Sequence, residues 1–245
     1  MNVIKSDLLR YVVLYEYGGL YVDLDTLDIR PLDRVTQRFS CIVVPSPWEH
    51  SIFDISLPFY LANGEMFCRP KHPFLQRLLS AVEVLKPKGV SGTMISPPFV
   101  TTKFREYKNL PKTTQIYPKR NSSTPYFFND DDTTLPPKDD IYVPNTRFFL
   151  DTPSPALRSR TLNTCANPNI TQPFIARMCF TVKIRGSDRK PGKFTFLTHQ
   201  FAHSWSPANT KHMKHVTPIA EVVAAENFTC DASEGRCQHR NAQIG

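Results

Sequence analysis

The sequence lacks several features that would assign it quickly to a class. No apolar run approaches the ~20 residues that a bilayer span needs, and no signal peptide is present. None of the six cysteines forms a C-x-x-C pair, which argues against a zinc cluster. No nucleic-acid-binding module and no repeat of fixed period is found. The net charge of +8 comes from dispersed Lys and Arg, so it predicts a solvated basic surface and no nucleic-acid partner.

The composition is that of a folded protein. The 245 residues, of which 40% are apolar and 21% charged, suffice for one sizeable domain with a core. An even number of cysteines is compatible with disulfides of undetermined connectivity, with 230 and 237 as the easiest local pair. Three N-x-[S/T] sequons begin at Asn121, Asn169 and Asn227. Cysteines and sequons together favour the Golgi or endoplasmic reticulum lumen over the cytosol.

The chain is organised around residues 6–25. Ser6 is a good helix N-cap, and Asp7 then falls in the first turn, where the helix dipole favours negative charge. Gly18 and Gly19 can supply the left-handed cap that ends the helix. We therefore expect a helix whose apolar residues at helical spacing form its core-facing stripe: Leu8, Tyr11, Val12 and Tyr15.

A short apolar segment, 20–24, follows the glycines and predicts a buried strand. Asp23 and Asp25 are two apart, so on a strand their side chains would point the same way. Two adjacent carboxylates raise one another's pKa, and a divalent cation such as Mg²⁺ or Mn²⁺ would remove that conflict. The alternative is a pair of surface aspartates at a strand exit.

The pattern S-D-L-L-R-Y-x-x-L-Y-x-Y-G-G-L-Y-x-D-L-D closely resembles the signature of the DxD sugar-transferase family, glycosyltransferase family 32. That family includes initiating mannosyltransferases, inositol-phosphoceramide mannosyltransferases, α1,4-galactosyl- and GlcNAc-transferases, and domains of clostridial toxins. Shorter segments also resemble family motifs: 30–32, 60–69, 72–74, 141–150 and, loosely, 94–107. Segment 199–205 resembles the closing motif H-H-F-x-G-S-W, although His203 occupies the usual Gly position.

The resemblance implies an α/β fold of the GT-A (Rossmann-like) type, with helices on both faces of a sheet. It also implies that the first strands, which hold much of the nucleoside pocket, and a membrane anchor lie upstream of this chain. We expect a single catalytic domain over 1–205, with loop-rich insertions at 110–140 and 151–192, and a polar C-terminal tail over 206–245. The acidic run 129–132 is expected to be a solvated loop.

The resemblance also suggests site residues. Asp23 and Asp25 form the catalytic pair, and with His199 they would hold Mn²⁺ (or Mg²⁺), Asp25 most directly. Ser204 and Trp205 would donate to the diphosphate of the donor. The alternative for His199 is a structural histidine at a strand end, and the alternative for Trp205 is a buried side chain with a satisfied N–H.

Three further residues lie close to the DxD motif. Tyr21 would seat the nucleotide or pack in the core. Asp7 and Arg10 share a helix face and would bind the donor sugar's hydroxyls, or form only an intrahelical ion pair. Asn63 serves a turn or binds a substrate hydroxyl, with the turn preferred.

The function expected is that of a metal-dependent, retaining hexosyltransferase. It would move a hexose from a UDP- or GDP-sugar to a glycolipid or glycan, by front-face attack of the acceptor. The alternative is a non-catalytic or incomplete relative that acts as a binding or partner subunit. A D-x-D phosphohydrolase is less well supported, because no second metal cluster accompanies the motif.

Overall fold

A computed structural model describes residues 2–36, 39–56, 59–85, 95–111, 137–201, 228–231 and 236–239 of the chain. The chain divides into two units, Met1–Phe201 and Ala202–Gly245. Among its described residues, the second unit forms an antiparallel hairpin of β6 (Phe228–Asp231) and β7 (Arg236–His239), in which Cys230 pairs with Cys237 in backbone register. Among the described residues, no helix is both long and apolar enough to cross a membrane.

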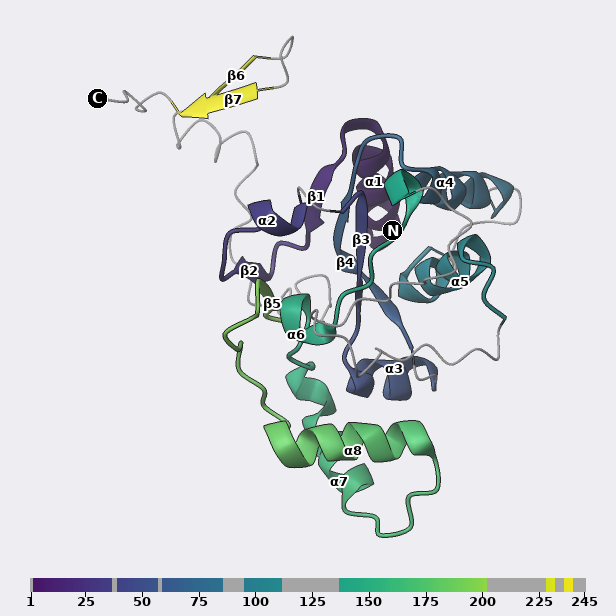
Figure 1. Cartoon of the computed structure of the whole chain (residues 1–245), viewed down its shortest axis with the longest axis vertical. Helices are drawn as coiled ribbons and strands as arrows, with labels where there is room; N and C mark the ends of the chain where they lie inside the picture. The colour runs from purple at the N-terminus through teal and green to yellow at the C-terminus, as the bar shows by residue number, and fades with distance from the viewer. Residues whose placement is uncertain are drawn as a thin grey trace. The chain divides into compact units, whose positions relative to one another are not determined.

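The first unit is built on a three-stranded antiparallel sheet with strand order β1-β4-β3 (Figure 1). Its strands are β1 (Gly19–Val22), β3 (Cys41–Pro45) and β4 (Leu61–Cys68), which is buried along almost its whole length. A second antiparallel pair joins β2 (Thr26–Asp28) to β5 (Leu197–His199), so the end of the unit returns to its beginning. The predicted α/β class is therefore confirmed at the level of a mixed α/β fold.

The main apolar core lies on one face of the sheet. Three helices cover it: α1 (Asn2–Tyr17), α4 (Pro73–Leu85) and α5 (Pro97–Tyr107), which lie together on one side of the strands in Figure 1. The apolar side of α4 faces this core, because Phe74, Leu75 and Leu78 are fully buried. Burial of such side chains contributes roughly 1.5–3 kcal/mol each.

A smaller apolar cluster covers the opposite face. It combines Ile42 and Val44 of β3 with Leu197 of β5 and Phe149 of α6 (Thr146–Phe149), while α2 (Asp33–Thr36) packs at its margin. Asn145 begins α6, because its side chain accepts a hydrogen bond from the N–H of Arg147 and so caps the helical turn.

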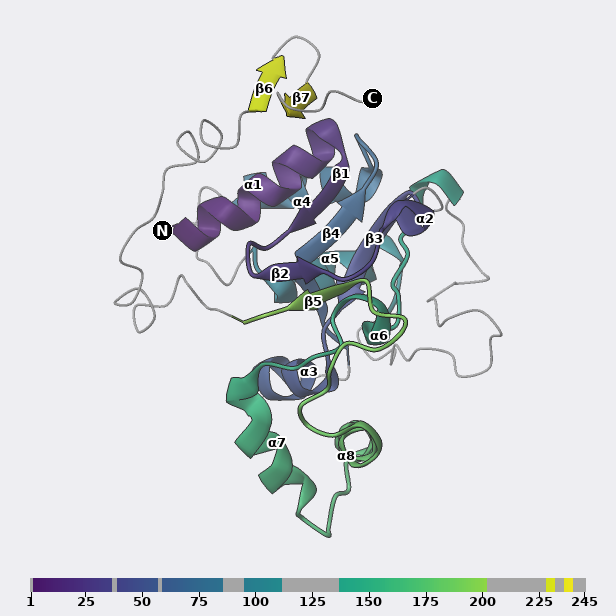
Figure 2. The same cartoon turned by 90° about the vertical axis from the view of Figure 1, so that its left-hand side faces the viewer.

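Residues 151–192 contain two helices, so the expectation of a loop-rich insertion was wrong. Helix α7 (Arg158–Cys165) and helix α8 (Pro173–Arg185) are joined by a disulfide between Cys165 and Cys179. They lie beyond α3 (Trp48–Ile55), at the end of the unit away from α1 and α4 (Figures 1 and 2). A second disulfide, Cys41–Cys68, joins β3 to β4. The expected insertion at 110–140 lies mostly outside the described residues.

The opening helix and strand differ from prediction in three respects. Helix α1 begins at Asn2, because Ile4 extends the apolar pattern and packs on the core, so Ser6 is not an N-cap and Asp7 is not in the first turn. Val12 is 38% exposed, since the buried stripe centres on Tyr11 and Leu14. Strand β1 is an edge strand that is only partly buried.

The glycine break was predicted correctly. Gly18 and Gly19 both have positive φ, and the N–H of Gly18 donates to the carbonyl of Leu14 at 2.9 Å. A Cβ at Gly18 would also lie 2.5 Å from the ring of Pro70. The chain therefore requires glycine here both for its conformation and for the space.

Candidate functional site

Asp23 and Asp25 lie in the connection between β1 and β2, immediately beyond the strand on which they were expected. The N–H of Asp23 donates to the Gly64 carbonyl at 2.8 Å, and the Asp23 carbonyl accepts from Thr26 at 2.9 Å, which closes a turn. The carbonyl of Asp25 accepts from Gln200 at 2.7 Å. The two carboxylates are thus brought to one place by a turn and by the neighbouring strand, and strand alternation plays no part.

His199 joins the two aspartates from the far end of the unit. It ends β5, where it pairs with Thr26 in register. Its Nε2 lies 3.2 Å from Oδ1 of Asp25 and 3.9 Å from Oδ2 of Asp23. One ligand atom from each of the three residues lies within 4.8 Å of the others. The structure therefore brings together the three residues predicted to hold a metal.

The spacing of this cluster fits a hard divalent cation. Bonds of about 2.0–2.1 Å at right angles, as in octahedral Mg²⁺, place adjacent ligand atoms about 3 Å apart. Two carboxylates and one imidazole also match the oxygen and nitrogen donors that such cations accept. The three ligand atoms lie within 4.8 Å of one another, so small side-chain adjustments would bring them to this spacing.

His199 can provide a metal ligand under one condition. The N–H of Phe201 donates to its Nδ1 at 2.9 Å, so the proton of the neutral ring sits on Nε2 and faces Asp25. A cation can take Nε2 only if that proton leaves and Nδ1 becomes the protonated nitrogen. Ligation by His199 therefore requires the hydrogen bond from Phe201 to open.

A buried polar network adjoins the two aspartates. The Arg10 guanidinium lies 3.0 Å from Oδ1 of Asp7 and 3.3 Å from Oδ1 of Asp23. It also donates to the backbone carbonyl of Asn63 at 2.5 Å and lies over the Tyr21 ring, 4.5 Å from its centroid. The Asp7–Arg10 ion pair, which was the alternative to binding of the donor sugar's hydroxyls, is present, and Arg10 extends it to the DxD motif.

Asn63 belongs to this network and serves no turn. It lies within β4, and its amide nitrogen donates to Asp7 at 2.9 Å and to the hydroxyl of Tyr11 at 3.3 Å. The preferred reading of Asn63 as a turn residue was therefore wrong, because its side chain is 6% exposed and its amide orients a buried carboxylate.

Tyr21 contacts the motif directly. Its hydroxyl donates to Oδ1 of Asp23 at 3.0 Å, and its ring packs at the edge of the main core. Ser204 and Trp205, which were predicted to bind the diphosphate, lie outside the described residues.

Burial and charge act in opposite directions on the acids of the site. Burial raises the pKa of Asp7 to about 6, although Arg10 and Asn63 stabilise its anion. Burial also acts to raise the pKa of Asp23, but His199, Arg10 and Tyr21 outweigh it and hold that pKa below its usual value. Asp23 is thus an anion at neutral pH, as a metal ligand must be.

Sequence reasoning missed two neighbours on β4. Gly64 packs against the motif, where a Cβ would lie 2.7 Å from Oδ2 of Asp23. Glu65 is 1% exposed; its Oε1 accepts from Thr26 at 3.2 Å, while its Oε2 has no hydrogen-bond partner in the described part of the chain. Burial raises the pKa of Glu65 to about 7, opposed by His199 and reinforced by Asp23. A charged residue within an apolar strand was the signal available for Glu65.

Comparison with known proteins gives a consistent result. Residues 1–40 match the family described as "Glycosyltransferase sugar-binding region containing DXD motif". The chain is 33% identical over 78 residues to inositol phosphoceramide mannosyltransferase 1 of Schizosaccharomyces pombe, covering 32% of this chain and 21% of that protein. It is 31% identical over 64 residues to the initiation-specific alpha-1,6-mannosyltransferase of Saccharomyces cerevisiae, covering 26% of this chain and 12% of that protein.

A longer match is to the mannosyl phosphorylinositol ceramide synthase CSH1 of Saccharomyces cerevisiae, 26% identical over 116 residues, covering 45% of this chain and 28% of that protein. The matched part therefore spans between about a tenth and about a third of each relative's length. The resemblance to DXD glycosyltransferases predicted from the motif is confirmed.

Proposed function

We propose that this chain transfers a hexose from a UDP- or GDP-sugar to a glycolipid or glycan acceptor, with a divalent cation as cofactor. The convergence of Asp23, Asp25 and His199 within 4.8 Å of one another carries the proposal. Each relative is named as a mannosyltransferase or as a mannosyl-lipid synthase. The proposal includes a GT-A-type fold and retention of anomeric configuration through front-face attack, both of which come from the family resemblance.

Asp23, Asp25 and His199 would hold Mn²⁺ (or Mg²⁺). Such an ion supplies positive charge to the diphosphate that leaves when the glycosidic bond of the donor breaks. The chain's own contribution is to fix the ligands in advance. The turn closed by Thr26 and the backbone bond from Gln200 to Asp25 hold the two carboxylates, and Tyr21 donates to Asp23.

Arg10 positions Asp23 in this proposal. The side chains of Asp7 and Arg10 are only 5% and 6% exposed, and their polar atoms face each other, Asn63 and Asp23. These contacts support a role in which the pair sets the orientation of the DxD carboxylate. Binding of the donor sugar's hydroxyls by Asp7 and Arg10 stays a prediction, as does the contact of Tyr21, Ser204 and Trp205 with the nucleotide.

The acceptor and the compartment are proposals supported by chemistry and by the relatives' names. Two relatives are named for inositol phosphoceramide or mannosyl phosphorylinositol ceramide, so a glycolipid acceptor is favoured over a soluble glycan. Disulfides Cys41–Cys68 and Cys165–Cys179 persist in oxidising compartments, which supports the Golgi or endoplasmic reticulum lumen.

Two measurements test the proposal. The first is calorimetric titration of Mn²⁺, followed by UDP or GDP in its presence. The second is release of nucleotide or transfer of hexose from a panel of UDP- and GDP-sugars, with and without EDTA. We expect Mn²⁺ binding and EDTA-sensitive turnover in the wild type, and loss of both in Asp25→Asn.

The matched control is Asp28→Asn, because Asp28 is an exposed carboxylate on β2 close to the motif. It should leave binding and turnover unchanged. Binding of metal and nucleotide without turnover would favour the alternative of a binding or partner subunit. Absence of binding would contradict the proposed site.

A further inference from the structure

Helix α8 presents an apolar outer face. Phe180 and Ile184, one helical turn apart, are 53% and 64% exposed, whereas Met178 on the opposite side is fully buried. Isolated exposed apolar residues are common on protein surfaces. Here two large ones are adjacent at the centre of the solvent face, with Arg177 and Lys183 exposed on either side of them.

The orientation of this face is fixed by charged and covalent contacts. Arg185, at the end of α8, forms a bidentate ion pair with the buried carboxylate of Asp151. Arg189, in the loop that follows, donates to both carboxylate oxygens of Glu49 on α3, at 2.9 and 2.8 Å. The Cys165–Cys179 disulfide ties the helix to α7. Phe180 and Ile184 are therefore held outward by the packing of the opposite side.

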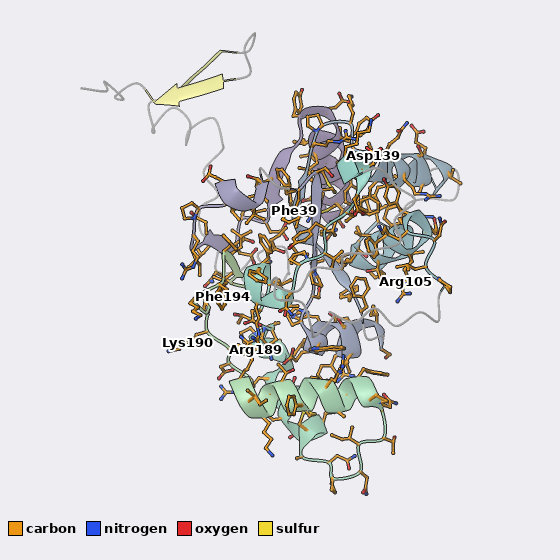
Figure 3. All side chains as sticks on the ribbon, viewed as in Figure 1. Phe39, Arg105, Asp139, Arg189, Lys190 and Phe194 are labelled. Carbon is orange, nitrogen blue, oxygen red and sulfur yellow. A yellow bond between two sulfur atoms is a disulfide. The ribbon has the colours of Figure 1, made fainter. Side chains whose placement is uncertain are left out.

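The region around this face is strongly basic. Helix α8 contains no Asp or Glu, and residues 155–194 contain eight Lys and Arg against one Asp. That Asp, Asp188, pairs with Arg158 at 2.9 Å. Within the described part of the chain, Lys183 and Lys190 form no ion pair. Figure 3 shows Lys190 and Phe194, which is 54% exposed, on the loop after α8.

We propose that the outer face of α8 docks on the surface of an anionic lipid bilayer. A helix that shows apolar side chains between basic ones lies well at a membrane interface, with its apolar groups at the acyl boundary and its cations at the headgroups. Anionic headgroups attract juxtamembrane Lys and Arg, so they would complement the charge of Lys183, which forms no ion pair among the described residues. A second copy of the chain is a poor occupant, because two such faces would bring cations together.

The inference does not depend on the proposed transfer reaction. It rests on exposure and charge in α8, none of whose residues belongs to the DxD site. If both proposals hold, docking would keep the chain at the surface where a lipid acceptor is found. Loss of docking and loss of turnover can be measured separately, since donor hydrolysis needs no membrane.

The test is co-sedimentation of the whole 245-residue chain with vesicles of phosphatidylcholine alone and of phosphatidylcholine with 30% phosphatidylinositol (a mole fraction of about one third, high enough to give a strong surface potential). We expect binding to the anionic vesicles, weak binding to the neutral ones, and a decrease as salt is raised, because salt screens exposed charges. Lys183→Gln should weaken the partition coefficient about fivefold, and the double variant Phe180→Ser/Ile184→Ser about tenfold or more.

Two matched controls should bind as the wild type does. Lys138→Gln removes an exposed cation elsewhere, and Val84→Ser removes a 70% exposed apolar side chain from α4. Circular dichroism and urea unfolding of every variant separate loss of docking from loss of folding. The salt dependence is measured on the wild type, so misfolding of a variant cannot affect it. Equal binding to both kinds of vesicle, no binding to the anionic ones, or equal loss in the controls would overturn the proposal. Full competition by soluble inositol phosphate would also overturn it, because it would indicate a headgroup pocket. Dimerisation that the α8 substitutions abolish would overturn it too, because the face would then be a dimer interface.

Discussion

The guanidinium of Arg10 lies 3.3 Å from Oδ1 of Asp23 and so connects helix α1 to the first aspartate of the DxD motif. The same guanidinium contacts Asp7 at 3.0 Å and the carbonyl of Asn63 at 2.5 Å. One planar cation thereby neutralises two carboxylates that would otherwise repel each other in a buried setting. The helix and the motif are consecutive in the sequence, but the turn at Gly18 allows them to face each other.

Arg10→Lys should lower activity far more than it lowers stability. A single ammonium keeps the charge but cannot donate at once to Asp7, Asp23 and Asn63. We expect Mn²⁺ affinity and donor hydrolysis to fall about 10–100-fold, as when other residues that orient metal ligands are lost. Urea unfolding measured beside the titrations checks the fold. An unchanged Mn²⁺ affinity would show that Arg10 does not position Asp23.

Gly64→Ala should disturb Asp23 with little effect on the core. The new Cβ would lie 2.7 Å from Oδ2 of Asp23, and the carboxylate end is the part that can move away. We expect about tenfold weaker Mn²⁺ binding by calorimetry, the low end of the range for disturbed ligand orientation. Gly192→Ala is the matched control, because a Cβ there meets nothing closer than 4.0 Å. Equal effects of the two substitutions would contradict the assignment.

His199→Gln should weaken Mn²⁺ binding at least as much as Gly64→Ala does, about tenfold or more. Ligation would require the Phe201 N–H bond to Nδ1 to open. Addition of Mg²⁺, which is diamagnetic, to the wild type should therefore move the imidazole resonances of His199 in nuclear magnetic resonance spectra. The ring proton should transfer from Nε2 to Nδ1. If the affinity is unchanged and the tautomer stays, His199 is a structural histidine that holds Asp25.

Glu65 should make the free energy of unfolding depend on pH in the absence of metal. Burial raises its pKa from 4.5 in the unfolded chain to about 7 in the folded one. The folded state therefore binds the extra proton between these values, and stability falls as pH rises from about 4.5 to about 7 and is level above that. The difference corresponds to about 3 kcal/mol at most.

Glu65→Gln keeps an oxygen for Thr26 to donate to and removes the titration. The free energy of unfolding should be measured with urea in EDTA, at pH 5 and at pH 8. At pH 5 the wild type and the variant should have similar stability. At the higher pH the variant should be more stable. Parallel curves for the two proteins would show that Glu65 does not carry the proton.

The local parts of the site could be predicted from the amino-acid sequence alone. Residues 6–25 indicated the helix, the glycine break, the two aspartates and the Asp7–Arg10 pair, because each depends on neighbours within one or two turns of chain. The closing motif also pointed to His199. The same reasoning misplaced the start of α1 and the role of Ser6. The helix begins at Asn2 because Ile4 packs against the main core.

The groups that surround those residues depend on the tertiary structure. Asn63, Gly64 and Glu65 reach the motif because β4 pairs with β1 in one register, and no local pattern specifies that register. Likewise, β2 and β5 must pair for His199 to meet Asp25. Helices α7 and α8 escaped prediction because a disulfide and the pairs Arg185–Asp151 and Arg189–Glu49 hold them, with little apolar periodicity. Contacts between residues distant in sequence thus placed the acids, the histidine and the outer face of α8, because burial and charge act through space.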